Sequence, residues 1–150
     1  MNFEGTSDYT YDDYRNGIYL LAEKIKDFKP DYVCGISRGG LVPAVEISYK
    51  NNIPLVTLDP RSIYSVNSLH RLLTSETISV IMVDEICDSG ATVKKVHDLF
   101  EKEFQWAFLV YNISQTVIKN PIYHYAINRN NDKRYFNFHW DRKNIHETEK

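Results

Sequence analysis

Apolar residues recur with a helical period near the start of the chain. Five of them lie at steps of four, three, four and three: Tyr14, Ile18, Leu21, Ile25 and Phe28. These steps place the five side chains on one face of a helix. Thr10 can cap the helix, because Asp13 follows three residues later, and Pro30 stops it. The pattern therefore predicts an amphipathic first helix between Thr10 and Pro30.

Short, almost wholly apolar runs follow, and they alternate with further helical segments. The runs predict strands at residues 32–36, 53–58, 78–83 and 106–111, with helices at 41–49 and 91–104 and two short strands at 123–127 and 135–138. Strands this apolar are typical of parallel sheets that are buried on both faces. Alternating strands and helices imply right-handed crossovers. We therefore expect an α/β fold with a central parallel sheet flanked by helices.

Domain organisation follows from what lies between these elements. The chain shows no internal repeat, low-complexity tract or linker rich in Pro, Gly or Ser, so residues 1–150 are expected to form a single domain. Residues 59–77 lack a strong period and predict a long loop that could contain some regular structure, and residues 84–90 predict a shorter loop. In an open parallel sheet, ligands bind beyond the carboxyl ends of the strands, which draws attention to the loops that leave those ends.

Charge and cysteine content narrow the function classes. Lys plus Arg number 18 and Asp plus Glu number 20, so a net charge of −2 gives no basic face for nucleic acid or for an anionic membrane. No apolar run approaches the roughly 20 residues of a membrane span, and the N-terminus lacks the pattern of a signal peptide. Two cysteines, Cys34 and Cys87, form neither a disulfide scaffold nor a metal pattern. The simplest interpretation is a reduced, cytoplasmic protein.

Two kinds of chemistry meet in the loop after the strand at 78–83. One half, where the loop enters the next helix, consists of Ser89, Gly90, Ala91 and Thr92. Backbone N–H groups at a helix start suit a phosphate, and the two hydroxyls add donors. The other half carries Asp84 and Glu85, which can accept hydrogen bonds from ribose hydroxyls or hold a hydrated Mg²⁺. A ribose 5-phosphate presents both features in one molecule.

A second loop with phosphate-binding character follows the strand at 32–36. Gly39 and Gly40 allow unusual backbone angles and expose N–H groups, and Arg38 supplies a forked cation for phosphate oxygens. Such a nest fits a pyrophosphate. Both loops also have a purely structural interpretation, in which Asp88 caps the following helix and the two glycines form only a tight turn.

The residues of both loops resemble those of type I phosphoribosyltransferases. Residues 80–92 match the family's signature for phosphoribosyl pyrophosphate (PRPP): four apolar residues, two acids, two variable residues and then Asp-Ser-Gly-Ala-Thr. Residues 37–43, Ser-Arg-Gly-Gly-Leu-Val-Pro, look like the pyrophosphate loop of bacterial xanthine-guanine enzymes, in which a non-proline cis peptide is expected between Ser37 and Arg38. The resemblance implies a phosphoribosyltransferase fold with PRPP and Mg²⁺ as ligands.

The resemblance also assigns roles by position. It implies that Asp88 and residues 89–92 wrap the 5-phosphate, that Asp84 and Glu85 bind the ribose hydroxyls and Mg²⁺, and that Asp88 is the general acid/base near the purine. Ser37, Arg38, Gly39 and Gly40 would hold the pyrophosphate. Residues 59–77 would form a lid that closes over PRPP and excludes water. Residues 112–150 would form a hood that selects the base.

The hood departs from the family pattern in one place. Tyr135, Phe136 and Asp141 lie where relatives contact the base, Tyr135 or Phe136 by stacking. The lysine that donates to O6 of 6-oxopurines is replaced by Ser114 in our alignment. The expected reaction joins a base, with 6-oxopurines favoured, to PRPP and releases pyrophosphate and a nucleoside monophosphate. Relatives are usually homodimers or homotetramers.

Two alternatives remain open from the sequence. A regulatory protein on the same fold could bind PRPP or a nucleotide without turnover, and the missing lysine favours it. A receiver-like signalling domain also clusters acids at strand ends, but it has no need of the glycine loop or the phosphate turn. The chain lacks a P-loop and a Gly-x-Gly-x-x-Gly motif, which disfavours nucleotide triphosphatases and dehydrogenases.

Overall fold

A parallel five-stranded sheet forms the centre of the molecule. The computed structural model describes residues 5–112, 123–129, 132 and 134–141. The strand order is β3-β2-β4-β5-β6, and every neighbouring pair is parallel. The strands are β2 (Tyr32–Ile36), β3 (Leu55–Leu58), β4 (Val80–Cys87), β5 (Gln105–Tyr111) and β6 (Tyr123–Asn128).

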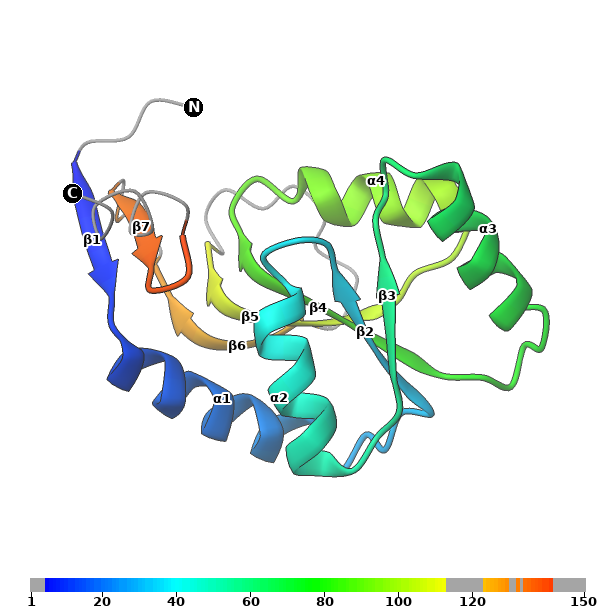
Figure 1. Ribbon diagram of the computed structural model, residues 1–150, viewed down its shortest axis with the longest axis horizontal. Coiled ribbons are helices and arrows are strands. Elements are labelled where there is room, and N and C mark those ends of the chain that lie inside the picture. Colours follow the sequence, from blue (N-terminus) through cyan, green and yellow to red (C-terminus); the bar gives the residue numbers. More distant parts are fainter. Residues whose placement is uncertain (1–4, 113–122, 130–131, 133, 142–150) are drawn as a thin grey trace.

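Four helices cover the two faces of this sheet. They are α1 (Tyr11–Ile25), α2 (Leu41–Asn51), α3 (Ile63–Leu72) and α4 (Ala91–Phe100). Figure 1 shows α1 and α2 along one side of the sheet and α4 along the other. The result is a three-layer α/β arrangement, as the alternation of apolar and helical segments predicts.

Two hydrophobic cores form because successive strand residues point to opposite faces. Ile81 and Val83 of β4 pack in the core beneath α1 and α2, whereas Met82 between them packs in the core with α3 and α4. The two cores together bury this strand completely, because Ile81, Met82 and Val83 all have no exposed surface. A strand buried on both faces therefore supports the loop that follows it.

The first helix forms as its sequence predicts. The side chain of Thr10 accepts a hydrogen bond from the backbone of Asp13, and the Asp13 carboxylate accepts one from the backbone N–H of Thr10, which completes a capping box. Tyr14 and Ile18 are buried on the face that contacts the sheet. The apolar spacing thus identifies both the helix and its buried side.

Several segments differ from the sequence prediction. Residues 59–77 are not a continuous loop, because α3 occupies their middle and buries Val66 and Leu69. Strand β4 continues through the acids to Cys87, where a loop was expected from Asp84 onward. Helix α4 ends at Phe100 rather than 104, because Glu101 adopts a left-handed conformation with a φ of 49°.

A second, small sheet joins the beginning of the chain to its last described strand. Strand β1 (Thr6–Tyr9), which the sequence analysis did not predict, pairs in parallel with β7 (Tyr135–Phe138). Figure 1 draws these two strands side by side, apart from the main sheet. Tyr9 anchors the pair in the core, with its ring 5.0 Å from that of Phe138. The segment expected to contact the base is therefore held by the N-terminal strand.

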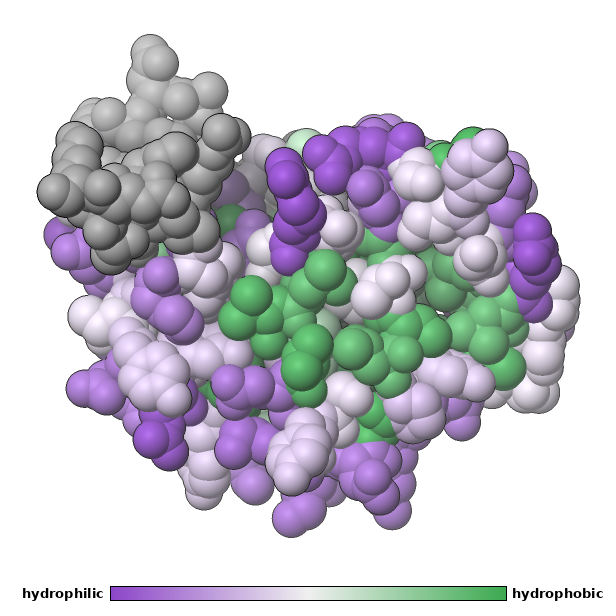
Figure 2. Space-filling model, in the orientation of Figure 1, coloured by the Kyte–Doolittle hydropathy of each residue, from purple (hydrophilic) through white to green (hydrophobic). Residues whose placement is uncertain are grey.

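Exposed apolar side chains gather on one surface. Figure 2 shows hydrophobic side chains over α2 and the edge strand β3, and both Val45 and Leu55 in these elements are exposed.

Within the described residues, no helix combines the length and hydrophobicity that crossing a membrane requires.

Candidate active site

The two loops singled out in the sequence lie next to each other at the edge of the sheet. The glycine loop follows β2 and the acidic loop follows β4, and these strands are direct neighbours. The chain runs from β2 to β3 on one side and later from β4 to β5 on the other, so the strand order reverses between β2 and β4. Such a switch point opens a crevice at the carboxyl ends of the strands.

The glycine loop is shaped to let an acid approach it. The peptide bond between Ser37 and Arg38 is cis, as the sequence comparison predicts. A Cβ atom at Gly39 would overlap the carboxylate of Glu85, and one at Gly40 would overlap the carbonyl oxygen of Val83. Only glycine at these two positions allows the loop to lie directly on β4.

The acidic pair is buried without a cation among the described residues. Asp84 is 8 % exposed, and its side chain accepts a hydrogen bond of 3.0 Å from the backbone N–H of Glu85. Burial raises the pKa of Asp84 well above its ordinary value, and the neighbouring charge of Glu85 adds to the shift. Burial also raises the pKa of Glu85, whose Oε2 has no hydrogen-bond partner.

These two carboxylates fit a cation that arrives with a phosphorylated ligand. No group of three or more potential metal-binding side chains exists in the part of the chain that the structure describes, so this protein region alone offers no complete metal cage. Mg²⁺ is commonly held by one or two carboxylates together with substrate phosphates. The unpartnered Oε2 of Glu85 is the atom that such an ion would satisfy.

Residues 89–92, predicted to hold a phosphate, form the turn that enters α4. Gly90 precedes the helix with a φ of 85°, in the left-handed region that favours glycine. Residues 84–93 and Phe108 line a cavity of about 190 Å³ around this turn. Asp88, Ser89, Gly90, Ala91 and Thr92 are thereby brought together, beside Asp84 and Glu85.

Helix caps distinguish the site from the rest of the fold. Among the described residues, α1 and α3 have side-chain caps, from Thr10 and Ser62 respectively. The two helices that begin at the crevice, α2 and α4, start at Gly40 and Gly90 and have no side-chain cap. The first N–H of α2, from Leu41, is donated to the carbonyl oxygen of Arg38 over 3.1 Å. The first N–H of α4, from Ala91, is donated to the hydroxyl oxygen of Ser89 over 3.3 Å. The N–H groups of the next positions, Val42 in α2 and Thr92 and Val93 in α4, remain for an anion.

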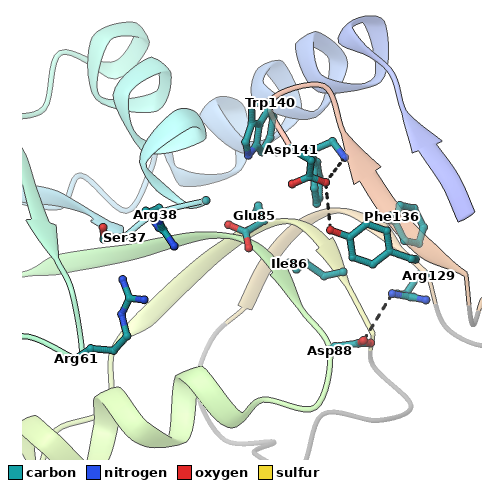
Figure 3. A pocket seen from close by; sticks show the side chains of 13 residues that line it. Ser37, Arg38, Arg61, Glu85, Ile86, Asp88, Arg129, Phe136, Trp140 and Asp141 are labelled. Carbon is teal, nitrogen blue, oxygen red and sulfur yellow. Dashed lines mark hydrogen bonds and ion pairs between the residues drawn. The ribbon is translucent and has the colours of Figure 1, made fainter. Parts of the chain in front are cut away.

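A larger cavity of about 720 Å³ joins the glycine loop to the hood. Figure 3 shows Arg38 and Arg61 on one side of it, Arg129 and Phe136 on the other, and Glu85 and Ile86 between them. Arg61 was not among the predicted site residues. It is held by Asp59, with Nε and Nη2 donating to the two carboxylate oxygens over 2.9 and 3.1 Å.

The predicted base-contacting residues line this cavity in different ways. Tyr135 is 39 % exposed, and its hydroxyl donates to Asp141 Oδ2 over 3.4 Å. Asp141 also accepts a hydrogen bond from the backbone of Phe138, which closes the turn after β7. Phe136 is buried, and the guanidinium carbon of Arg129 lies 4.7 Å from the centre of its ring. Tyr135 is thus the more open of the two aromatic surfaces.

A row of three polar residues crosses the carboxyl edge of the sheet. The row consists of Asp88, Asn112 and Arg129. Each of them directly follows one of three residues that are paired across β4, β5 and β6, namely Cys87, Tyr111 and Asn128 respectively. Asn112 Nδ2 donates to Asp88 Oδ1 over 3.0 Å, and Arg129 Nη1 lies 3.6 Å from Asp88 Oδ2. Of these three residues, only Asp88 was predicted from the sequence. Ser114, which replaces the lysine expected for 6-oxopurines, lies outside the described residues.

An open parallel sheet with uncapped helix starts and buried acids at its switch point is the architecture of α/β proteins that bind phosphorylated ligands. The chain belongs to the phosphoribosyl transferase domain family, whose model matches residues 11–141. An adenine phosphoribosyltransferase from Trichodesmium erythraeum is 27 % identical over 100 residues, which cover 57 % of this chain and 59 % of that protein.

Solved structures share the fold. A purine phosphoribosyltransferase from Pyrococcus horikoshii has a TM-score of 0.68 and 24 % identity, with 91 % of this chain and 93 % of that chain covered. A hypothetical protein from Neisseria gonorrhoeae with bound ppGpp has a TM-score of 0.75 and 22 % identity over 99 % and 96 % of the two chains. A Helicobacter pylori xanthine-guanine-hypoxanthine phosphoribosyltransferase has a TM-score of 0.66 and 16 % identity over 97 % and 99 %. The type I phosphoribosyltransferase fold is thereby established.

Proposed function

We infer that this protein is a purine phosphoribosyltransferase. It transfers the 5-phosphoribosyl group of PRPP to a purine base and releases pyrophosphate and a nucleoside monophosphate. The observation that carries this proposal is the pairing of two uncapped helix starts, α2 and α4, with a buried acidic pair between them. A ribose with a phosphate at position 5 and a pyrophosphate at C1 would use both helix starts and the acidic pair.

The residues divide the work by position. Residues 89–92 hold the 5-phosphate, and the loop from Ser37 to Gly40 holds the pyrophosphate with the guanidinium groups of Arg38 and Arg61. N9 of the base attacks C1 of the ribose, the bond from C1 to pyrophosphate breaks, and Asp88 accepts the proton that the base loses at N7. Positive groups preorganised around the leaving pyrophosphate stabilise the charge that develops on it.

Mg²⁺ completes the charge balance in this proposal. When bound with PRPP it would neutralise the pyrophosphate and reduce the repulsion between Asp84 and Glu85. The unpartnered oxygen of Glu85 and the raised pKa of both acids support this role, because each indicates a site that is electrostatically incomplete without a cation.

The lid is proposed in a narrower form than the sequence implied. Helix α3 is packed by Val66 and Leu69, and the ring of His70 lies 4.4 Å from that of Phe100 on α4. The segment that borders the cavity is the one before the helix, around Arg61. We therefore assign any closing movement to residues 59–62 rather than to the whole of 59–77.

Pyrophosphate release from PRPP and Mg²⁺ tests the proposal, with guanine, xanthine, hypoxanthine, adenine, uracil and orotate as acceptors. Release with a purine is expected. PRPP binding without release for any base would favour a regulatory protein on this fold, and absence of PRPP binding would refute the proposal. A cytoplasmic location and a homodimer or homotetramer remain predictions, the latter testable by sedimentation velocity.

A further inference from the structure

Arg129 is almost fully buried at the edge of the large cavity, where its guanidinium is fixed on three sides. Its side chain is 2 % exposed, and it lines the cavity. Nε donates to the carbonyl oxygen of Asp132 over 2.7 Å, and Nη2 donates to that of Arg134. The planar group lies over the ring of Phe136. These contacts restrict both the position and the rotation of the guanidinium.

One nitrogen of this fixed group has no hydrogen-bond partner. Nη1 is buried without a hydrogen-bond partner, and it forms an ion pair with Asp88 Oδ2 at 3.6 Å, beyond hydrogen-bond range. A buried guanidinium N–H without an acceptor is unfavourable unless a ligand supplies one. The hood therefore holds a directed donor beside the carboxylate proposed to accept the proton of the base.

A donor next to an acceptor matches one edge of a purine. In the tautomer that leaves N9 free to attack, N7 carries a proton that Asp88 can accept. Position 6 lies beside N7 on the same edge, and a carbonyl there accepts a hydrogen bond whereas the amino group of adenine donates. Arginine has no acceptor atom, so adenine would leave two donors facing each other.

We propose that Arg129 selects 6-oxopurines, because its Nη1 donates to the oxygen at position 6 while Asp88 binds N7–H. This inference rests on the proposed function and names its substrate class: guanine, hypoxanthine or xanthine rather than adenine. The Trichodesmium relative is named for adenine, so the proposal predicts that this protein and that relative differ in the base they accept.

The test compares the specificity constant kcat/KM for hypoxanthine and for adenine in four proteins. Wild type is expected to prefer hypoxanthine by at least about 100-fold, since a site built to hydrogen-bond one group rejects an analogue that cannot pair. Arg129→Gln offers an amide that can accept from the amino group, so its preference should fall at least about tenfold. Arg129→Lys keeps a charged donor and should retain the preference at lower turnover.

Arg15→Gln is the matched control, because Arg15 is exposed on α1 and does not line the cavity. It should leave the preference unchanged. A wild-type preference for adenine, or the same ratio in Arg129→Gln and Arg15→Gln, would overturn the inference while leaving the transferase function intact. A loss of stability in Arg129→Gln with no change in the ratio would show that Arg129 only holds the hood together, and would also overturn it.

Failure of the proposed function would be seen separately, as no turnover with any base. Calorimetric binding of inosine and adenosine monophosphates to the same proteins then decides the inference. Tighter binding of the inosine nucleotide that is lost in Arg129→Gln supports it, and equal binding of the two nucleotides rejects it.

Discussion

The burial of Glu85 lowers the free energy of unfolding of the unliganded protein. Its carboxylate lies on Gly39 without a hydrogen bond for Oε2, and burial raises its pKa. The folded protein therefore holds the proton to a higher pH than the unfolded chain does. The free energy of unfolding should fall as the pH rises above the ordinary carboxyl range, and Mg²⁺ with PRPP should reverse this loss.

Glu85→Gln should thus stabilise the free protein and weaken its ligand binding. At pH 7 we expect a gain of about 1 kcal/mol in the free energy of unfolding, which corresponds to a rise of about 2–4 °C in Tm. The gain should shrink towards pH 4, and calorimetry should show greatly reduced PRPP affinity. Glu76→Gln, at an exposed site, is the control and should change neither quantity. A destabilised Glu85→Gln protein at pH 7 would contradict the argument.

Asp88, the proposed proton acceptor, is held by residues that follow two other strands. Asn112 donates to one carboxylate oxygen, and Arg129 lies near the other. Asp88→Asn preserves the size of the side chain but removes the base, so kcat should fall about 10²- to 10³-fold with the fold intact. Steady-state pyrophosphate release measures this. Asp98→Asn on the exposed face of α4 should retain full activity, and near-normal turnover in Asp88→Asn would remove Asp88 from the catalytic role.

Asn112 and Arg129 show where inference from the sequence alone stops. Asn112 directly follows the apolar run that ends at Tyr111, a signal that the sequence does contain, whereas Arg129 follows the polar Asn128. Their convergence with Asp88 depends on register, because Cys87, Tyr111 and Asn128 must lie in one row across three strands. Register and strand order are tertiary facts, whereas the two phosphate loops are local motifs and were predicted from their residues.

At the scale of elements, α3 was missed although Ile63, Val66, Leu69 and Leu72 recur at steps of three within it. Only Val66 and Leu69 are buried in its ten residues, while Ile63 is 63 % exposed. Strand β4 was predicted too short for the opposite reason, since two acids in a row look like a loop although Asp84 is buried within the strand. For β4, packing against the rest of the fold thus decided the structure over the local pattern.

The packing of α3 can be tested by truncating one side chain at a time. Leu69→Ala should lower the free energy of unfolding by about 2–4 kcal/mol, because Leu69 lies in the core shared with α4. Ile63→Ala, on the exposed side of the same helix, should change it by less than about 0.5 kcal/mol. Urea unfolding measures both. Equal, small effects would mean that α3 is a loosely held lid after all.

For the whole molecule, the pairing of β1 with β7 links the segment proposed to bind the base to the beginning of the described chain. Tyr9 is 2 % exposed and packs against Phe138, close to the turn that Asp141 closes. The loops proposed to bind PRPP instead follow β2 and β4 of the main sheet. Damage to β1 should therefore affect the base before it affects PRPP.

Tyr9→Ala should raise the KM for the base about tenfold or more and cost about 3–5 kcal/mol of stability, because it empties a buried aromatic site. The affinity for PRPP should remain within about twofold when measured well below the lowered Tm. Tyr9→Phe is the control: it keeps the ring and removes a buried hydroxyl that has no hydrogen-bond partner, so stability should be equal or higher. Parallel loss of PRPP and base binding in Tyr9→Ala would contradict the separation.

The same pairing has a consequence for the order in which the protein matures on the ribosome. Asp8 and Asn137 are in contact although 129 residues separate them in sequence. Strand β1 is synthesised first but must wait for β7, whereas both phosphate loops have their supporting strands by the time β5 emerges. A nascent chain that stalls after β5 would thus carry both loops proposed to hold PRPP before it has the segments proposed to select a base.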